Sequence, residues 1–211
     1  MDNHIADGLI QYLMLVSLLT FHEFAHAWTA WKCGDDTARL QGRLSLNPLV
    51  HIDPIGTVLL PLLMIFMPGV GRFMIGWARP VPFNHNKLGS PQRDEVLISM
   101  AGPGMNLLLA VGLVALAKVM LLLHSAGAAD LFVQAATLSL LLCFFNLIPV
   151  PPLDGSHVLR VMTNMSFEAY AQFARFGFII VIVLLQFRPV TQTLWSVTLG
   201  TLETLTRIFG L

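Results

Sequence analysis

Two histidines and a glutamate stand close together in an apolar stretch near the N-terminus of the chain. They are His22, Glu23 and His26, in the run FHEFAH. On an α-helix, two histidines four residues apart project from the same face about one turn apart, so both imidazoles can bind one zinc ion. Glu23 is adjacent to this pair and can reach a water molecule on the metal. The spacing therefore predicts a zinc site with a carboxylate base beside it.

The apolar surroundings of this run strengthen the prediction. A charged side chain in the middle of a membrane helix costs about 2.5–3.5 kcal/mol on insertion scales. Such residues persist where they form pairs, bind a metal or react. The alternative is that His22 and His26 form hydrogen bonds to neighbouring helices and that Glu23 is their buried partner.

A catalytic zinc site needs a third protein ligand, because such sites keep three protein ligands and one open position. Asp154 is the candidate, in the run FNLIPVPPLDGSHVL. The prolines of this run stop a helix, and non-helical backbone at membrane depth is tolerated only where it is buried or lines a wet cavity. Asp154 therefore has a reason to face a cavity. The alternative is an ordinary turn in which Asp154 caps a helix that begins near His157.

Composition places the chain among membrane proteins. Of its 211 residues, 55% are hydrophobic and 11% are charged, whereas soluble domains carry about 25% charged residues. The same balance excludes intrinsic disorder. The 12 basic residues are matched by 12 acidic ones, so the chain lacks the basic excess that nucleic-acid binding requires. We expect one all-α polytopic membrane domain that covers residues 1–211.

The length that a membrane helix needs sets the expected architecture. With about 20 mostly apolar residues per span, we predict a helical bundle of about 4–6 membrane segments. A small strand-containing or re-entrant region lies between the first two core helices, and Asp53 and Pro54 are expected to start its apolar run. Whether residues 190–209 span the membrane stays open. The predicted segments are core helices at about 8–33, 95–123 and 131–154, the re-entrant or strand region 34–94 with short strands at 39–46 and 72–83, and C-terminal helices within 168–209.

Three motifs occur in order along the chain. The first is HExxH in the run described above. The second, GxxxN, is met by Gly102 and Asn106, and the third, NxxPxxxxDG, by residues 146–155. Together with the runs GRLSLNPLVHIDPIGT and GWARPVPFN, they make the chain similar to the site-2 protease family of intramembrane zinc metalloproteases. The likeness is to small bacterial members that lack a PDZ domain, and we expect no PDZ or CBS module.

The resemblance implies a role for each of five residues. His22, His26 and Asp154 would bind one Zn²⁺ ion per chain. Glu23 would be the catalytic base, and Asn146 would help to hold the substrate carbonyl or its oxyanion. The implied activity is that of a zinc-dependent endopeptidase that hydrolyses peptide bonds of transmembrane or membrane-associated protein segments within the bilayer.

The partners implied by the resemblance are a transmembrane protein substrate and the lipid bilayer, with no nucleic acid. The sequence leaves the oligomeric state open. A transmembrane substrate must unwind locally, and the strand-like residues 75–83 are a candidate to receive it by strand addition.

Two other functions are compatible with the same ligands. One is a membrane zinc transporter, and the other is a non-proteolytic helix-binding scaffold. A transporter does not need a carboxylate such as that of Glu23, which is next to the zinc ligands but is not one of them. A scaffold has no reason to keep ionisable side chains that are costly to bury in a membrane. Glu23 therefore favours proteolysis.

Basic residues gather between the first two core helices. Residues 32–94 contain seven of the 12 lysines and arginines, whereas residues 1–8 and 124–130 contain none. By the positive-inside rule, 32–94 is predicted to be cytoplasmic, which places the active site toward the cytoplasmic side of the cell membrane. Because the first eight residues lack Lys and Arg, we expect no cleavable signal peptide.

Overall fold

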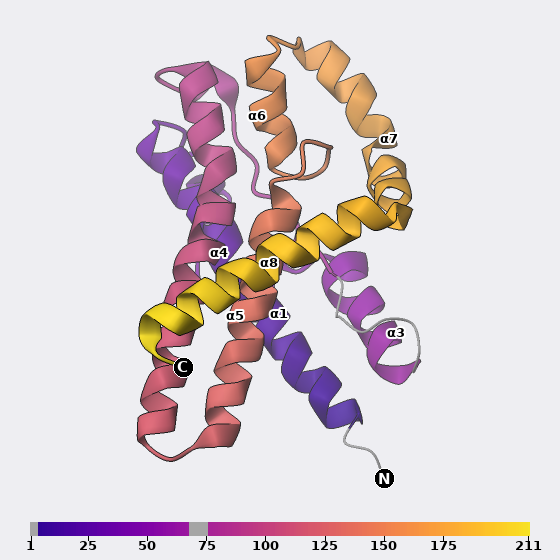
Figure 1. The fold of residues 1–211 in the computed structure, drawn as a ribbon. Coiled ribbons are helices and arrows are strands. Elements are labelled where there is room, and N and C mark those ends of the chain that lie inside the picture. The colour runs from indigo at the N-terminus through magenta and orange to yellow at the C-terminus, as the bar shows by residue number, and fades with distance from the viewer. Residues whose placement is uncertain (1–3, 68–75) are drawn as a thin grey trace. The chain divides into compact units, whose positions relative to one another are not determined.

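The computed structural model describes residues 4–67 and 76–211, and helices make up most of them (Figure 1). The chain divides into two compact units, residues 1–89 and residues 90–211, and each is described by itself. The described elements of the first unit are α1 (His4–Lys32), α2 (Thr37–Leu40), η1 (Pro48–His51), η2 (Pro54–Leu59), α3 (Leu60–Phe66) and η3 (His85–Lys87). Those of the second unit are α4 (Pro91–Leu122), α5 (Ala126–Asn146), α6 (Gly155–Met162), α7 (Phe167–Gln186) and α8 (Arg188–Phe209).

Helix α1 carries the HExxH run and is long enough to cross a membrane. Its 29 residues, at about 1.5 Å each, give a length of about 44 Å. It begins at His4, earlier than predicted, and at Gly8 it approaches α3 so closely that a Cβ atom would lie 3.0 Å from Ile65 Cγ1. At the other end, the Lys32 ammonium lies 4.6 Å from the Trp31 ring centre. An aromatic and basic pair of this kind is typical of a membrane interface.

The strands predicted between the first two core helices are absent from the described residues of that region. Residues 39–46 form the end of α2 and an irregular turn, so that prediction is wrong. Gly42 has a φ of +70°, and the Arg43 N–H donates to a carbonyl of α2 at 2.8 Å, which closes the chain into a turn. Residues 76–84 are non-helical but pair with no strand. The remainder of the second predicted strand, 72–75, lies outside the described residues.

Asp53 begins the apolar helix of this region, as predicted. Its carboxylate accepts hydrogen bonds from the backbone N–H groups of Ile55 at 3.0 Å and Gly56 at 2.7 Å. Pro54 occupies the first helical position, where its missing N–H costs nothing. The helical run Pro54–Phe66 is shorter than a full crossing requires. Its length agrees with a re-entrant path, which stays a prediction.

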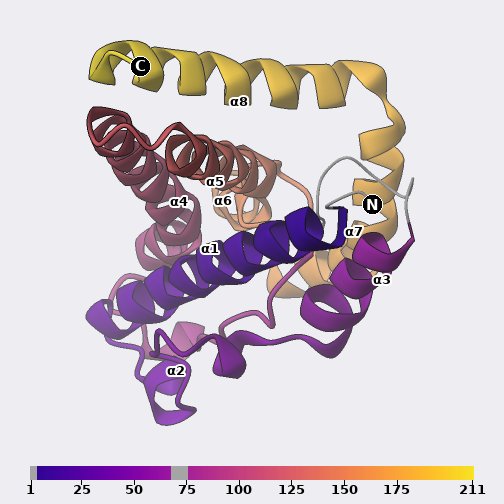
Figure 2. The same ribbon diagram turned by 90° about the horizontal axis from the view of Figure 1, so that it is seen from below.

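In the second unit, α4 and α5 form a hairpin, and α8 packs against it (Figures 1 and 2). Ser139 Oγ on α5 donates a hydrogen bond to the Asn106 carbonyl on α4 at 2.7 Å. Small side chains at such a contact let two membrane helices approach closely. The core residues are Ala110, Val114, Ala136 and Leu140, and the α8 side chains that pack against them are Leu202, Leu205 and Phe209.

Helix α5 ends earlier than predicted. The third core helix was expected over about 131–154, but it runs from Ala126 to Asn146, so the predicted end is wrong. The prolines of the PVPP run cannot continue a helix, because they lack an N–H and clash with the preceding turn. The chain turns back here, and a Cβ on Gly155 would collide with the Leu147 backbone. The close approach at the start of α6 therefore requires glycine.

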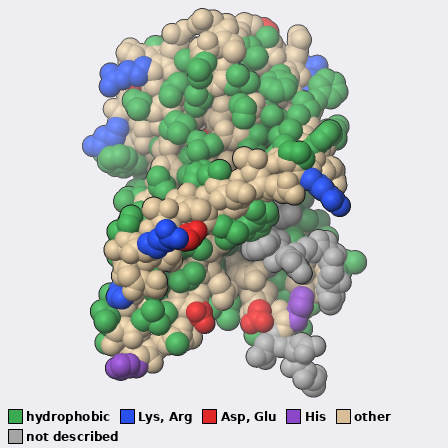
Figure 3. Space-filling model, viewed as in Figure 1, with side chains coloured by type: hydrophobic (Ala, Val, Ile, Leu, Met, Phe, Trp, Pro, Cys, Tyr) green, Lys and Arg blue, Asp and Glu red, His purple; other side chains and the backbone are tan. Residues whose placement is uncertain are grey.

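Four of the described helices are long and apolar enough to cross a membrane, namely α1, α4, α5 and α7; α8 is not among them. Helix α7 exposes large apolar side chains, such as Phe176 at 62% and Ile179 at 60%. Figure 3 shows hydrophobic side chains spread over the visible surface. Lipid is the solvent that such a surface suits. The protein is a multi-pass all-α membrane protein, as predicted.

Candidate active site

His22 and His26 lie on one face of α1, and both are buried. Their Nε2 atoms are 3.0 Å apart. Two nitrogens that each sit about 2.0–2.1 Å from one zinc ion are at most about 4.2 Å apart, so this pair fits a shared metal. The same distance suits a hydrogen bond between two neutral rings. The geometry predicted from the four-residue spacing is thus present.

Glu23 is buried beside the two histidines, with 8% of its surface exposed. Its Oε2 atom accepts a hydrogen bond from the backbone N–H of Val81 at 3.0 Å. The donor lies 58 residues further along the chain, in the non-helical stretch 77–84, called here the 77–84 segment. A hydrogen bond to an ionised carboxylate is stronger than one between neutral groups. The carboxylate therefore has one oxygen fixed by the main chain.

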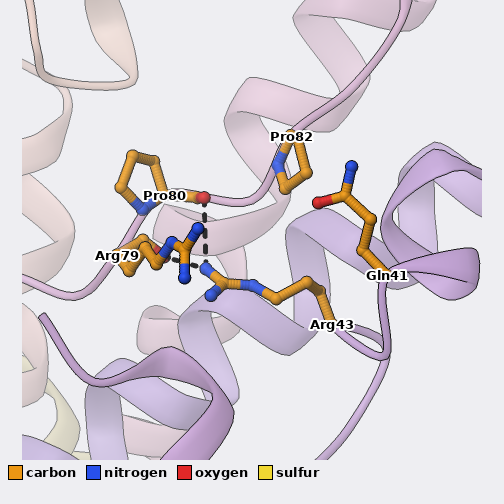
Figure 4. Close-up of a pocket in the computed structure, with 5 residues that line it drawn as sticks. All are labelled: Gln41, Arg43, Arg79, Pro80 and Pro82. Atoms are coloured by element: carbon orange, nitrogen blue, oxygen red, sulfur yellow. Dashed lines mark hydrogen bonds between the residues drawn. The ribbon is translucent and has the colours of Figure 1, made fainter.

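Arg43 fastens the 77–84 segment just before Val81 (Figure 4). Its guanidinium donates to the carbonyls of Val50 at 2.5 Å and Pro80 at 3.1 Å, and also to the carbonyl of Arg79. Arg43 is 6% exposed, so these carbonyls replace the water that a charged group needs. One buried cation thus ties two separate stretches of the first unit together.

A small polar cavity of about 190 Å³ opens beside this arginine, and Figure 4 shows its wall. The 77–84 segment supplies part of that wall through Arg79, Pro80 and Pro82. The lining residues are Gln41, Arg43, Arg79, Pro80 and Pro82.

Further hydrogen bonds fix both ends of the 77–84 segment. Near its start, the Thr57 hydroxyl donates to the Trp77 carbonyl at 2.7 Å. At its end, the carboxylate of Asp35, which is fully buried, accepts a hydrogen bond from the Asn84 N–H at 2.5 Å. A buried carboxylate engaged in this way holds the backbone in place. The segment beside Glu23 is therefore held at its start, middle and end.

The other two predicted site residues belong to the second unit. Asn146 is the last residue of α5 and Asp154 directly precedes α6, so the two stand at either end of the connection 147–153. Asn146 Nδ2 donates to the Leu142 carbonyl at 2.9 Å, which uses one of the two amide protons. Asp154 occupies the N-cap position of α6, but its side chain makes no capping hydrogen bond to that helix. The alternative role of Asp154 as a helix cap is therefore not borne out.

A buried ion pair anchors α6 to α4. Glu95 of α4 is fully buried, and its carboxylate accepts hydrogen bonds from Arg160 Nε at 2.8 Å and from Arg160 Nη2. His157 Nδ1 lies 3.0 Å from the same carboxylate. The bond from Glu95 raises the pKa of Arg160 further above its already high ordinary value. Because α6 begins directly after Asp154, this anchor also fixes the position of Asp154 within the second unit.

Comparisons with known proteins identify the family of the chain. The sequence profile of peptidase family M50 matches residues 118–187. A Bacillus subtilis protein named "Putative zinc metalloprotease YwhC" is 37% identical over 213 residues, which cover 96% of this chain and 93% of that protein. Proteins named "Putative zinc metalloprotease Rip2" from Mycolicibacterium smegmatis and Mycobacterium tuberculosis are also 37% identical. These matches cover 79% and 76% of this chain, and 62% and 61% of those proteins. No solved structure matches the chain.

The chain belongs to peptidase family M50, the site-2 protease family of zinc metalloproteases. The predictions of an enzyme, of the metalloprotease class and of zinc as its cofactor are confirmed. The donor set suits this metal, because the buried imidazole pair of α1 supplies the nitrogen ligands that zinc prefers.

Three residues that shape the site were missed by sequence reasoning: Arg43, Val81 and Glu95. Glu95 left a signal, because a carboxylate inside a long apolar helix needs a partner. Val81 left none, because its contribution is a backbone N–H, which every residue except proline carries. Arg43 lies in the run GRLSLNPLVHIDPIGT. The resemblance of this run to the family does not indicate a role for the arginine.

Proposed function

We propose that this protein is a zinc-dependent endopeptidase that hydrolyses peptide bonds of transmembrane or membrane-associated protein segments within the bilayer. The observation that supports this most is the buried face of α1, where two imidazole nitrogens lie 3.0 Å apart and Glu23 is held by a main-chain N–H. His22, His26 and Asp154 are the proposed ligands of one Zn²⁺ ion. A catalytic zinc ion usually has three protein ligands, so the two histidines need a third. Asp154, which follows the non-helical connection after α5 and directly precedes α6, is the proposed third ligand.

The proposed roles divide the hydrolysis among three groups. Zinc, when bound, supplies Lewis acidity that polarises the scissile carbonyl and lowers the pKa of water at the site toward about 7. Glu23 Oε1 accepts a proton from the attacking water, whose oxygen bonds to the carbonyl carbon. The C–N bond then breaks, and Glu23 returns the proton to the leaving nitrogen. Asn146 keeps one amide proton after its bond to the Leu142 carbonyl, and this proton can stabilise the oxyanion.

The substrate class follows from the helix that carries the site. A helix in the bilayer keeps its amides in internal hydrogen bonds, so a transmembrane substrate must unwind locally before cleavage. Strand addition along residues 75–83 is not part of this proposal, since Ile75 lies outside the described residues. The Arg79 carbonyl and the Val81 N–H are also already engaged within the protein.

We further propose that the protein lies in the cell membrane with its active site toward the cytoplasm, on the strength of the basic residues in 32–94. Single cysteines at Gln41 and Lys87, both exposed, in a background without Cys33 and Cys143, would be labelled by a membrane-impermeant reagent. Labelling of both from the cytoplasmic side is expected. Labelling from opposite sides would contradict this topology.

The activity itself is tested with purified, zinc-loaded protein and a panel of single-span membrane helices, with and without a chelator. We expect at least one helix to be cut within its apolar span, with the bond located by mass spectrometry and the cleavage abolished by the chelator. Glu23→Gln should bind the same helix without cutting it. Failure to cut any helix under these conditions would contradict the proposal.

The same preparation separates the two rival functions. A scaffold would bind helices equally well with and without zinc and would cut none. A transporter would move zinc across vesicles and would keep doing so in the Glu23→Gln variant, because Glu23 is not a proposed ligand.

A further inference from the structure

We propose that the backbone N–H of Val81 and the side chain of Arg43 are positioning groups for the base Glu23. They act on the reaction only by fixing the carboxylate, and neither touches the substrate. This inference rests on the proposed function for its kinetic consequence. Its structural part, the hydrogen bond between Val81 and Glu23, is independent of that function.

The first step of the argument concerns the freedom of the glutamate side chain. A free glutamate side chain loses rotamer entropy when it is fixed in one conformation. Here the Val81 N–H holds Oε2 at 3.0 Å. With Oε2 engaged, Oε1 is the oxygen that the proposed reaction uses for the proton. The two oxygens of the carboxylate therefore differ in role: Oε2 is held by the main chain, and Oε1 accepts the proton.

The second step concerns what keeps the Val81 N–H in place. Val81 has proline on both sides, and these two residues cannot form main-chain hydrogen bonds through a nitrogen. The segment must therefore be held through its carbonyls, and Arg43 binds those of Arg79 and Pro80, the two residues directly before Val81. A lysine could not do the same, because it lacks the planar set of donors that lets one guanidinium reach several carbonyls.

The third step concerns charge. Burial lowers the pKa of Arg43, while the carboxylate of Glu23 raises it and Arg79 lowers it again. An arginine remains protonated under these conditions. Arg43 therefore keeps all of its guanidinium donors, which its hydrogen bonds to the carbonyls of the 77–84 segment require.

Hydrogen exchange in protein labelled with ¹⁵N-valine tests the contact without any need for activity. The Val81 amide should exchange slowly in the wild type and at least about 10-fold faster in Glu23→Ala, because a lost hydrogen bond to a charged group is worth about 1.5–3 kcal/mol. Arg43→Lys should also speed this exchange, by a smaller factor. Equal exchange rates in the wild type and in Glu23→Ala would overturn the inference.

Kinetics test the consequence with a matched pair of variants. Val81→Pro removes the N–H and should lower kcat by about 10²-fold, the cost of a catalytic group misplaced by about 1 Å. Its KM and zinc content should stay near those of the wild type. Val81→Ala shortens the side chain but keeps the donor, so its loss of kcat should be far smaller. Equal losses in the two variants, or a loss of zinc in Val81→Pro, would overturn the positioning role.

The two experiments keep the inference separate from the proposed function. If the wild type cuts no helix but the Val81 amide is protected through Glu23, the proposed function fails and the contact stands. If the wild type cuts a helix and Val81→Pro cuts it equally fast, the function stands and the inference fails.

Discussion

The two units of the chain hold their functional side chains by different means. In the first unit, the hydrogen bonds that fix Glu23 and the 77–84 segment each join one side chain to one main-chain group, and a single arginine binds several carbonyls. In the second, a fully buried pair of opposite charges, Glu95 and Arg160, fixes α6. A main-chain donor survives most substitutions at its own position, whereas an ion pair depends on both of its side chains. Single side-chain changes should therefore harm the anchor of the second unit most.

The largest effect is expected where one partner of that ion pair is removed. Glu95→Ala leaves the guanidinium of Arg160 buried and unpaired, which typically costs about 3–5 kcal/mol of stability. Thermal unfolding in detergent, followed by circular dichroism, measures the loss. The double variant Glu95→Gln with Arg160→Met removes both charges and should recover most of it. A loss of stability below about 1 kcal/mol in Glu95→Ala would contradict the expectation that the second unit depends more strongly on single side chains than the first.

A smaller effect, confined to catalysis, is expected at the end of α5. Asn146→Ala should lower kcat by about 10²–10³-fold if the amide donates to the oxyanion. Zinc content and the unfolding temperature should not change, because the Asn146 amide donates to the Leu142 carbonyl of its own helix and so anchors no other element. A change in KM alone would instead make Asn146 a contact to the bound substrate before reaction.

In the first unit, a side-chain cap offers a test of local stability. Asp53→Ala removes the acceptor for the Ile55 and Gly56 N–H groups at the start of η2. The expected cost is about 1 kcal/mol, measured by thermal unfolding. Asp53→Asn keeps an acceptor oxygen and should lose only a fraction of this. A loss as large as that of Glu95→Ala would show that side chains matter equally in both units.

The smallest effect is expected for the exposed ion pair between Asp36 and Lys87, 2.6 Å apart. The hydrogen bond from Lys87 holds the pKa of Asp36 below its usual value of 3.8. A carboxyl with a lowered pKa in the folded state contributes stability near neutral pH and loses it as the pH falls through that lowered pKa. The small gap in unfolding temperature between the wild type and Asp36→Asn should therefore close below pH 3.8. A gap that widens on acidification would contradict the assignment.

The sequence predicts local features of this protein better than long-range ones. The positions of His22 and His26 follow from helical periodicity, and the cap at Asp53 follows from its neighbours. The prolines predict that a helix stops in this run, but the predicted third core segment runs through to residue 154, whereas α5 ends at Asn146. The contact of Glu23 with Val81 could not be predicted, because it joins residues 58 apart through a backbone group without a sequence signature.

The predicted strand at 39–46 fails for a related reason. Its composition suits a strand, but a strand also needs a partner, and none is present in the described part of that region. The left-handed φ of Gly42 instead turns the chain so that Arg43 is buried beneath the 77–84 segment. Whether a polar residue serves a strand face or a buried anchor depends on contacts that lie far away in the sequence.

We propose that one zinc ion is held by His22 and His26 together with Asp154, and that Glu23 is the base and not a ligand. The most direct test is the zinc content of the wild type, Glu23→Gln and Asp154→Ala, purified in parallel and measured by atomic absorption. We expect about one zinc per chain in the first two proteins and almost none in the third. Cleavage should be present only in the wild type. A full zinc content in Asp154→Ala, or the loss of zinc in Glu23→Gln, would contradict the proposed ligand set.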